Sequence, residues 1–373
     1  MNDSIRDRMP NITNKFFQLL RYALDERQQA PQIEADEWET MYEMAKKQSI
    51  VGIVFESVKR MNEKTEIPRQ LKMKWFFQVN KIKNRNMLLN QRSAELAAMF
   101  RQDGFECCVL KGQGNAMMYP DPFLRMSGDV DVLCMSLSDG RNGMVDVKDH
   151  VIRYVRKIKP KAEVRYYHVE FKYHEVPAEA HFMPGIMNNP IYNSRLQKWY
   201  RSHSTFQMVE LPKGVGAIPV PTWEFNVVYQ LAHLMHHFFD EGIGLRQFVD
   251  YYYLLQKAEN KLEISHEELE KTLHHLNLYQ FAGAVMYVER DVLGLEEKYL
   301  IVPVDERRGK TLLGEILKGG NFGRSSGLRQ SPTGKKYFLK GWRNMHFVRE
   351  YPAEALCEPI FRTWHYFWRL RYS

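Results

Sequence analysis

Several features are scarce in this sequence of 373 residues, and each scarcity excludes a class of protein. No stretch reaches the roughly 20 apolar residues that a membrane-spanning helix needs, and the first residues lack the apolar centre of a secretion signal. The four cysteines contain no C-x-x-C pair, so neither a disulfide framework nor a zinc site is indicated. They are Cys107, Cys108, Cys134 and Cys357. We therefore expect a cytoplasmic protein with reduced cysteines.

A strong charge of either sign is also missing. There are 53 Lys and Arg residues and 45 Asp and Glu residues, so the formal net charge is only +8. Such a mildly basic surface suits nucleotides, RNA or anionic lipid but does not choose among them. The composition, with 44% hydrophobic residues, is that of a folded protein, and the chain is long enough for two or three domains.

Helical periodicity is present toward both ends of the chain. Apolar residues recur at intervals of three and four through 12–103, where Pro31 and Pro68 interrupt the pattern. Gly104 is expected to end the last helix of this region. Beyond Pro184 the pattern is helical again, and no internal repeat is present.

The segment between these helical regions has a different period. An apolar run at 105–110 is typical of a buried strand, 129–134 predicts a second strand, and 143–158 predicts a helix. Alternation in 162–183 predicts two more strands, with a hairpin turn near 175–177. These elements form a small α/β unit.

The predicted fold class is therefore α+β, with a small mixed-sheet core between helical regions. Four segments are expected: an N-terminal helical region (1–103), the α/β core (104–184), a C-terminal helical region (185–317), and a basic loop with a final aromatic helix (318–373).

Two acids stand one residue apart in the stretch RMSGDVDVLC, residues 125–134. In a strand, Asp129 and Asp131 share one face and lie roughly 6.5–7 Å apart along the chain. Two carboxylates this close repel each other unless a cation lies between them. Mg²⁺ fits this need, because it binds carboxylate oxygens and shares its other positions with substrate phosphates. Two such ions, roughly 3.5–4 Å apart, serve phosphoryl and nucleotidyl transfer.

A third acid is then expected on an adjacent strand, roughly 4.8 Å away. Glu179 fits best, because its neighbours Ala178 and Ala180 belong to the opposite, inward face. Glu170 and Glu175 are weaker alternatives. The metal ligands and candidate catalytic residues are therefore Asp129, Asp131 and Glu179.

The pattern Gly-Asp-x-Asp, after a Gly-containing turn from strand to helix, resembles the polymerase-beta-type nucleotidyltransferase superfamily. A closer resemblance is to an uncharacterised bacterial nucleotidyltransferase-like family with a Lys-Gly turn, a Tyr-Pro-Asp-Pro loop, an Arg and then Gly-Asp-x-Asp. These motifs stand here as VLKGQGNAMMYPDPFLRMSGDVDVLC (109–134), followed by EAHF (179–182) and HLMHHFFDEGIGLRQFVDYYYLL (233–255). The resemblance covers roughly residues 15–260.

This resemblance implies the nucleotidyltransferase fold, two metal-binding aspartates (Asp129 and Asp131) and a third acid that maps onto Glu179. It also implies two Mg²⁺ ions, with Mn²⁺ as an alternative, and an NTP substrate. Lys111 and Gly112 would form the turn beneath the triphosphate. The superfamily's commoner turn is Gly-Ser or Gly-Gly, whereas this chain has Lys111, Gly112 and Gln113, so a Lys would supply the phosphate charge.

Two arginines are further candidates for nucleotide binding. Arg125 would contact phosphate or pair with Asp121 or Asp129 to order its loop. Arg246 would form a helical ion pair with Asp250 at i,i+4 or hold a phosphate.

Histidines cluster in the later helical segment. His233 and His237 share a helix face, but no Glu completes an H-E-x-x-H zinc motif around them or His236, so packing is the simpler role.

The sequence thus predicts a metal-dependent nucleotidyltransferase that moves a nucleoside monophosphate from an NTP to a hydroxyl acceptor and releases pyrophosphate. The acceptor would be a small molecule, a protein or RNA, and the oligomeric state is open. The alternative is a catalytically decayed nucleotidyltransferase fold that binds RNA or protein. In either case the basic stretch 318–341 would contact a polyanion or act as a solvated linker. The final aromatic helix would pack on the domain or lie on an anionic membrane surface.

Overall fold

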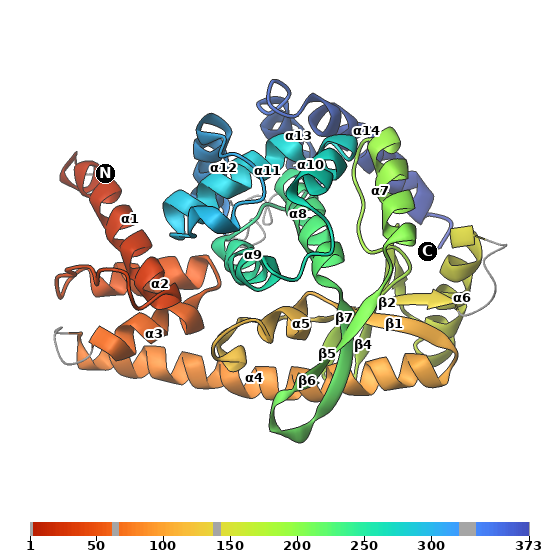
Figure 1. Ribbon diagram of the computed structural model, residues 1–373, viewed down its shortest axis with the longest axis horizontal. Coiled ribbons are helices and arrows are strands. Elements are labelled where there is room, and N and C mark those ends of the chain that lie inside the picture. Colours follow the sequence, from red (N-terminus) through yellow and green to blue (C-terminus); the bar gives the residue numbers. More distant parts are fainter. Residues whose placement is uncertain (1–2, 62–66, 137–142, 321–332, 373) are drawn as a thin grey trace.

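The computed structural model describes residues 3–61, 67–136, 143–320 and 333–372, and its fold is α+β as predicted (Figure 1). The N-terminal helices are α1 (Asp3–Leu24), α2 (Trp38–Lys47), α3 (Val51–Met61) and α4 (Arg69–Gln102). Two helices lie among the strands, α5 (Gly112–Ala116) and α6 (Gly143–Ile158). The later helices are α7 (Pro190–Ser202), α8 (Trp223–Phe239), α9 (Leu245–Ala258), α10 (His266–His275), α11 (Tyr279–Tyr287), α12 (Glu306–Gly319), α13 (Thr333–Met345) and α14 (Pro352–Arg369).

A mixed sheet of five strands forms the α/β core. Its strands are β1 (Phe105–Leu110), β2 (Val130–Ser136), β3 (Glu163–Val164), β4 (His168–Tyr173) and β5 (Val176–His181), in the order β1-β2-β5-β4-β3. Only β2 and β5 run parallel, and the other three pairs are antiparallel. The segment 162–183 thus holds three strands rather than two. The hairpin turn between β4 and β5 is at 174–175, slightly before its predicted place.

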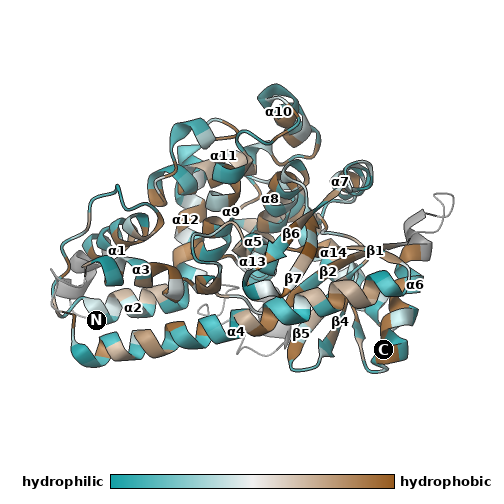
Figure 2. Ribbon diagram, turned by 60° about the horizontal axis from the view of Figure 1, so that its bottom comes forward, coloured by the Kyte–Doolittle hydropathy of each residue, from teal (hydrophilic) through white to brown (hydrophobic). Residues whose placement is uncertain are grey.

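Helix α4 connects the two hydrophobic cores of the molecule. Figure 1 shows it running below the N-terminal helices and on beneath the sheet, and Figure 2 shows hydrophobic and hydrophilic residues alternating along it. Trp75 and Val79 belong to the core of the helical part, whereas Leu96 and Phe100 belong to the core of the sheet. The helix ends where predicted, because Gly104 takes a φ of +83° that favours glycine.

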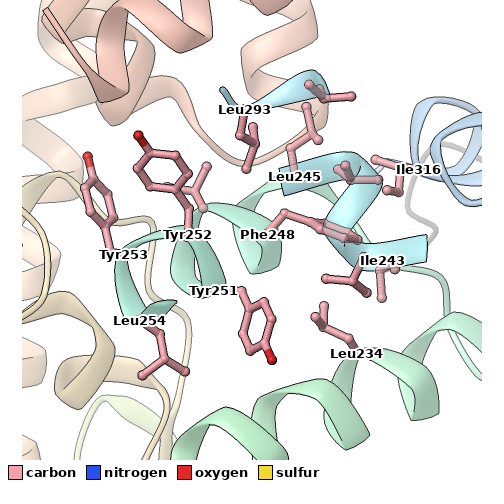
Figure 3. Close-up of a cluster of buried hydrophobic side chains, with 14 of the residues drawn as sticks. Leu234, Ile243, Leu245, Phe248, Tyr251, Tyr252, Tyr253, Leu254, Leu293 and Ile316 are labelled. Carbon is pink, nitrogen blue, oxygen red and sulfur yellow. The ribbon is translucent and has the colours of Figure 1, made fainter. Parts of the chain in front are cut away.

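The helices before and after the sheet share one core. Figure 3 shows part of it, where Phe248 of α9 lies near Ile316 and Tyr251 of α9 points toward Leu234 of α8. Buried Gln48 joins the two sets of helices, since its side chain donates to the Ile316 carbonyl and accepts from the Leu245 N–H. The four-segment division of the chain stays a prediction.

A second, two-stranded sheet lies within the region that was predicted to be wholly helical. Strands β6 (Phe206–Leu211) and β7 (Gly216–Pro221) form an antiparallel hairpin, and β7 contacts β1. The hairpin also approaches α5 closely: a Cβ at Gly114 would lie 2.9 Å from Val220 Cγ1. The expectation of helix throughout 185–317 was therefore wrong at this hairpin.

The stretch 318–341 was predicted to be a loop, and that prediction was wrong at both of its ends. Lys318 lies in α12, and 333–341 belongs to α13. The middle of the stretch, 321–332, lies outside the described residues.

A search of the described helices for membrane spans finds none with the length and apolar character to cross a bilayer. All four cysteines are free thiols.

Candidate functional site

Three acids from two neighbouring strands meet on one face of the sheet. Asp129 directly precedes β2, Asp131 lies within it, and Glu179 lies opposite Asp131 on the parallel strand β5. One carboxylate oxygen from each of the three lies within 4.8 Å of the others. Because strand side chains alternate, Val130 and Val132 point into the buried core instead. We call Asp129, Asp131 and Glu179 the acid set.

The turn from β1 to α5 brings a lysine beside the acid set. Leu110 pairs with Asp131 across the sheet, so the next residue, Lys111, emerges next to that carboxylate. Lys111 takes a φ of +50°, which is uncommon for a residue with a Cβ, and Gly112 follows with a φ of +40°. Lys111 Nζ lies 3.4 Å from Asp131 Oδ1 and 3.5 Å from His233 Nε2. The predicted turn residue and the acids therefore form one cluster.

The cluster faces a cavity of about 540 Å³. This volume is within the range of small-molecule sites, roughly 300–1,000 Å³. Helix α8 contributes His233 and His237 to its wall, and α14 contributes Phe361 and Arg362. Arg246 of α9 lines it as well. The C-terminal helix thus completes a cavity whose acidic wall is the sheet.

Two histidines that were not predicted as site residues lie against the acid set. His181 Nε2 is 3.0 Å from Asp131 Oδ1 and 3.1 Å from Glu179 Oε2. His168, which pairs with His181 across β4 and β5, has its Nε2 3.7 Å from Glu179 Oε2. The spacing Glu-Ala-His already implies that Glu179 and His181 share a strand face. The hairpin predicted within 162–183 implies pairing between these strands, but its turn was placed too late to bring His168 opposite His181.

Comparison with known protein families identifies a family to which this sequence is similar. A sequence model of a family described as uncharacterised nucleotidyltransferases matches residues 34–294. The chain belongs to this family. It indicates nucleotidyl transfer as the general class of activity. No curated protein matches the sequence.

Among solved structures, an antigenic nucleotidyltransferase-like protein from Paracoccidioides brasiliensis is similar to this chain. The two are 12% identical, with a TM-score of 0.36, and the match covers 59% of this chain and 95% of that one.

The range matched by the nucleotidyltransferase family includes the acid set, Lys111 and Arg246. It ends before α12, so the cavity residues of α14 lie beyond it. The acidic wall of the cavity therefore belongs to the part matched by the family, and the wall that α14 provides does not.

Burial and mutual repulsion set the charges of the two aspartates. Burial, with the nearby charges of Asp131 and Glu179, raises the pKa of Asp129 to about 6. Burial would also raise the pKa of Asp131, but Lys111 and the hydrogen bond to His181 outweigh it and hold that pKa well below its usual value. Asp131 is thus the more readily ionised member of the pair. Ionisation of Asp129 is the unfavourable one.

The acid set fits a divalent metal ion. Its donors are all carboxylate oxygens, the ligands preferred by hard dications such as Mg²⁺. Burial, and then the charges of Asp131 and Glu179, raise the pKa of Asp129, so its ionised form is unfavourable there without a further cation. Asp129, Asp131 and Glu179 would hold the ion.

Replacing Asp129 with Asn is expected to stabilise the metal-free protein at neutral pH. In wild type the pKa of about 6 in the folded state exceeds the ordinary value of 3.8 for an aspartate, so the folded state binds the proton more tightly. Wild-type stability is therefore lost as the pH rises from about 4 to about 6, and a neutral Asn escapes this loss. We expect a gain of up to about 3 kcal/mol at pH 8 and almost none at pH 4. Urea unfolding with chelator at both pH values measures it.

The matched control is Asp149→Asn, at an exposed position on α6, which should change stability by less than about 0.5 kcal/mol at either pH. Adding Mg²⁺ should reduce the advantage of Asp129→Asn, because the ion stabilises the folded wild type that binds it. An unchanged or lower stability of Asp129→Asn at pH 8 would contradict the electrostatic account of the acid set.

Two predicted nucleotide-binding residues have structural partners in the fold. Arg125 pairs with Asp250, not with Asp121 or Asp129 as predicted: its Nε and Nη2 each donate to the Asp250 carboxylate at 2.7 Å. Its Nη1 donates to Ser127 Oγ, so all three guanidinium nitrogens are engaged.

Gln113 is buried and donates to the side chain of Asn90 on α4, so it does not line the cavity. Arg246 does line it, and its Nη1 donates to the Met126 carbonyl at 2.6 Å. Arg246 stays a prediction as a phosphate ligand.

The remaining candidates, the α8 histidines and the alternative third acids, do not join the acid set. Burial, with the nearby charges of His236 and Lys111, lowers the pKa of His237 to about 3. Neither donor group found among the described residues includes the α8 histidines. Of the alternative third acids, Glu170 on β4 pairs with Arg165. Glu175, in the turn between β4 and β5, pairs with Arg92 of α4. Glu179 is the candidate that the structure brings to the aspartates.

Proposed function

We propose that this protein is a metal-dependent nucleotidyltransferase that transfers a nucleoside monophosphate from an NTP to a hydroxyl acceptor. The observation that carries the proposal is the acid set: three carboxylates gathered within 4.8 Å on the wall of a cavity large enough for a nucleotide. Like charges at this distance are costly even with Lys111 beside Asp131, so acids with a purely structural role are normally dispersed. A cluster of this kind is instead typical of a site for dications and phosphates.

The residues around the cavity have distinct proposed roles. Bound Mg²⁺, or Mn²⁺, would neutralise the triphosphate and activate the acceptor hydroxyl. Lys111 would attract the triphosphate, since its ammonium faces the cavity beside Asp131. Arg246 would contribute a second positive charge from α9.

Glu179 would take the proton from the acceptor hydroxyl. The acceptor oxygen then bonds to the α-phosphorus while the bond from that phosphorus to the bridging oxygen breaks, and pyrophosphate leaves. Glu179 is suited to this role because its side chain is 24% exposed and faces the cavity, whereas that of Asp131 is 6% exposed.

Calorimetric titration with each Mg·NTP tests the proposal. Wild type should bind at least one of them, and Glu179→Gln should bind it roughly tenfold or more weakly, because the acid set loses one charged ligand. Glu175→Gln is the control, since this acid stands in the hairpin turn and pairs with Arg92 outside the cavity. Equal binding by wild type and Glu179→Gln would count against the metal site.

The acceptor is identified by incubating the protein with α-labelled NTP and cell extract and finding which fraction keeps the label. Label in small molecules, protein or RNA separates the three acceptor classes. Salt-sensitive RNA binding without any retention of label would favour the alternative, a binding protein on a decayed catalytic fold.

A further inference from the structure

A second group of metal-binding side chains adjoins the acid set. His168, Glu179 and His181 each offer one donor atom, and the three atoms lie within 4.8 Å of one another. His168 and His181 face each other across β4 and β5, and Glu179 is two residues before His181 on the same strand face. Both histidines are buried, at 5% and 1% exposure. We call these three residues the histidine set.

The distances in the histidine set suit a single small ion. His181 Nε2 is 3.1 Å from Glu179 Oε2, and His168 Nε2 is 3.7 Å from the same oxygen. An ion with bonds of about 2.0–2.1 Å to nitrogen and oxygen needs neighbouring donors about 3.0–3.5 Å apart. The His181–Glu179 distance is within this range, the His168–Glu179 distance is slightly above it, and the donor atoms of the two histidines lie within 4.8 Å of each other. The strand register, rather than a flexible loop, holds the donors in place.

The donor chemistry of the histidine set differs from that of the acid set. Imidazole nitrogen is a ligand for Mn, Fe, Co and Zn ions, whereas Mg²⁺ prefers oxygen donors alone. Two histidines and one carboxylate on one face form an arrangement known from transition-metal sites. We propose that His168, Glu179 and His181 bind a first-row transition-metal dication beside the oxygen-only acid set.

Glu179 is the residue that connects the two sets, and its two carboxylate oxygens allow it to contact an ion in each. Charge balance alone does not explain the histidine set. One cation between Asp131 and Glu179 would answer their repulsion, and His181 is already in that place. His168 adds a second imidazole, whose Nε2 lies 3.3 Å from Glu170 Oε1 and 3.7 Å from Glu179 Oε2, and it offers the nitrogen ligand that a transition metal requires.

The decisive test uses the full-length protein without nucleotide. Chelator-treated wild type first receives excess Mg²⁺, which prefers the oxygen-only acid set, and then one equivalent of Mn²⁺, and pulsed electron paramagnetic resonance records couplings to ¹⁴N. The proposal expects couplings from two imidazoles, a signal that is independent of any catalytic turnover. Their absence in wild type would overturn it and leave His181 as a fixed internal counter-charge. The proposed nucleotidyl transfer would be untouched by that result.

Variants then assign the ligands. His168→Gln should lose one of the two ¹⁴N couplings and weaken Co²⁺ binding, followed by its visible absorption, by more than roughly tenfold. His236→Gln is the matched control, because His236 lines the same cavity outside the histidine set and should leave both signals unchanged. Unchanged Co²⁺ affinity in His168→Gln, with wild-type unfolding behaviour, would also overturn the proposal.

Discussion

Asp131→Asn is expected to lower the rate of pyrophosphate release from NTP by about a thousandfold. The change removes one charged oxygen from the acid set and nearly preserves side-chain volume, so positioning of the bound ions and stabilisation of the triphosphate are lost together. A loss of about 4 kcal/mol in transition-state stabilisation corresponds to this factor. The rate is measured at saturating Mg²⁺ with the NTP that wild type binds best.

Glu170→Gln is the control for this loss. Glu170 lies opposite Glu179 on β4 and lines the same cavity, but it pairs with Arg165 and belongs to neither donor set. Its removal should cost less than about tenfold. Equal losses in Asp131→Asn and Glu170→Gln would mean that the rate depends on general negative charge in the cavity rather than on the acid set.

Much of the acid set could be predicted from the sequence, because it rests on short-range geometry. Asp129 and Asp131 share a face through strand alternation alone, and the same rule gives Glu179 its face on β5. The assumption that added Glu179 was that its strand neighbours the first, and the β2–β5 pairing satisfies it. The roles of these residues remain proposals. Predicting that the three side chains lie together required only one assumption about residues distant in sequence, the pairing of β2 with β5.

The hairpin β6–β7 shows where pattern reading failed. Its sequence FQMVELPKGVGAIPVP (206–221) alternates and has a Gly-containing turn, which are hairpin signals. Pro219 and Pro221 obscured them, because proline removes a backbone donor and argues against a strand in the middle of a sheet. A two-stranded sheet consists only of edge strands, however, and such strands accept proline. Pro219 and Pro221 are therefore compatible with this hairpin.

The partner of Arg125 could not be predicted for a different reason. Asp250 is 125 positions away and reaches Arg125 only because α9 packs against the loop before β2. Local spacing offered Asp121 and Asp129 instead, and Asp121 in fact pairs with Lys83. Spacing within one element predicts its own face, but it contains no information about which other element covers that face.

Replacing Arg125 with Met is expected to destabilise the protein by about 3–5 kcal/mol, because it leaves the charge of Asp250 buried without its partner. The side chains of both residues are only 5% exposed, and Tyr119 is the other donor to the same carboxylate, at 2.5 Å. Urea unfolding at pH 7 measures the loss. Lys271→Met is the control: it breaks the exposed pair with Glu267 and should cost less than about 1 kcal/mol.

The double variant Arg125→Met with Asp250→Asn separates a structural role from a phosphate-binding one. Asn keeps an acceptor for Tyr119 and removes the stranded charge, so the double variant should be more stable than Arg125→Met alone. If Arg125 instead served the nucleotide, Arg125→Met would weaken Mg·NTP binding at nearly unchanged stability, and Asp250→Asn would not restore it. The engagement of all three guanidinium nitrogens favours the first outcome, since a phosphate would have to displace a buried bidentate pair to reach them.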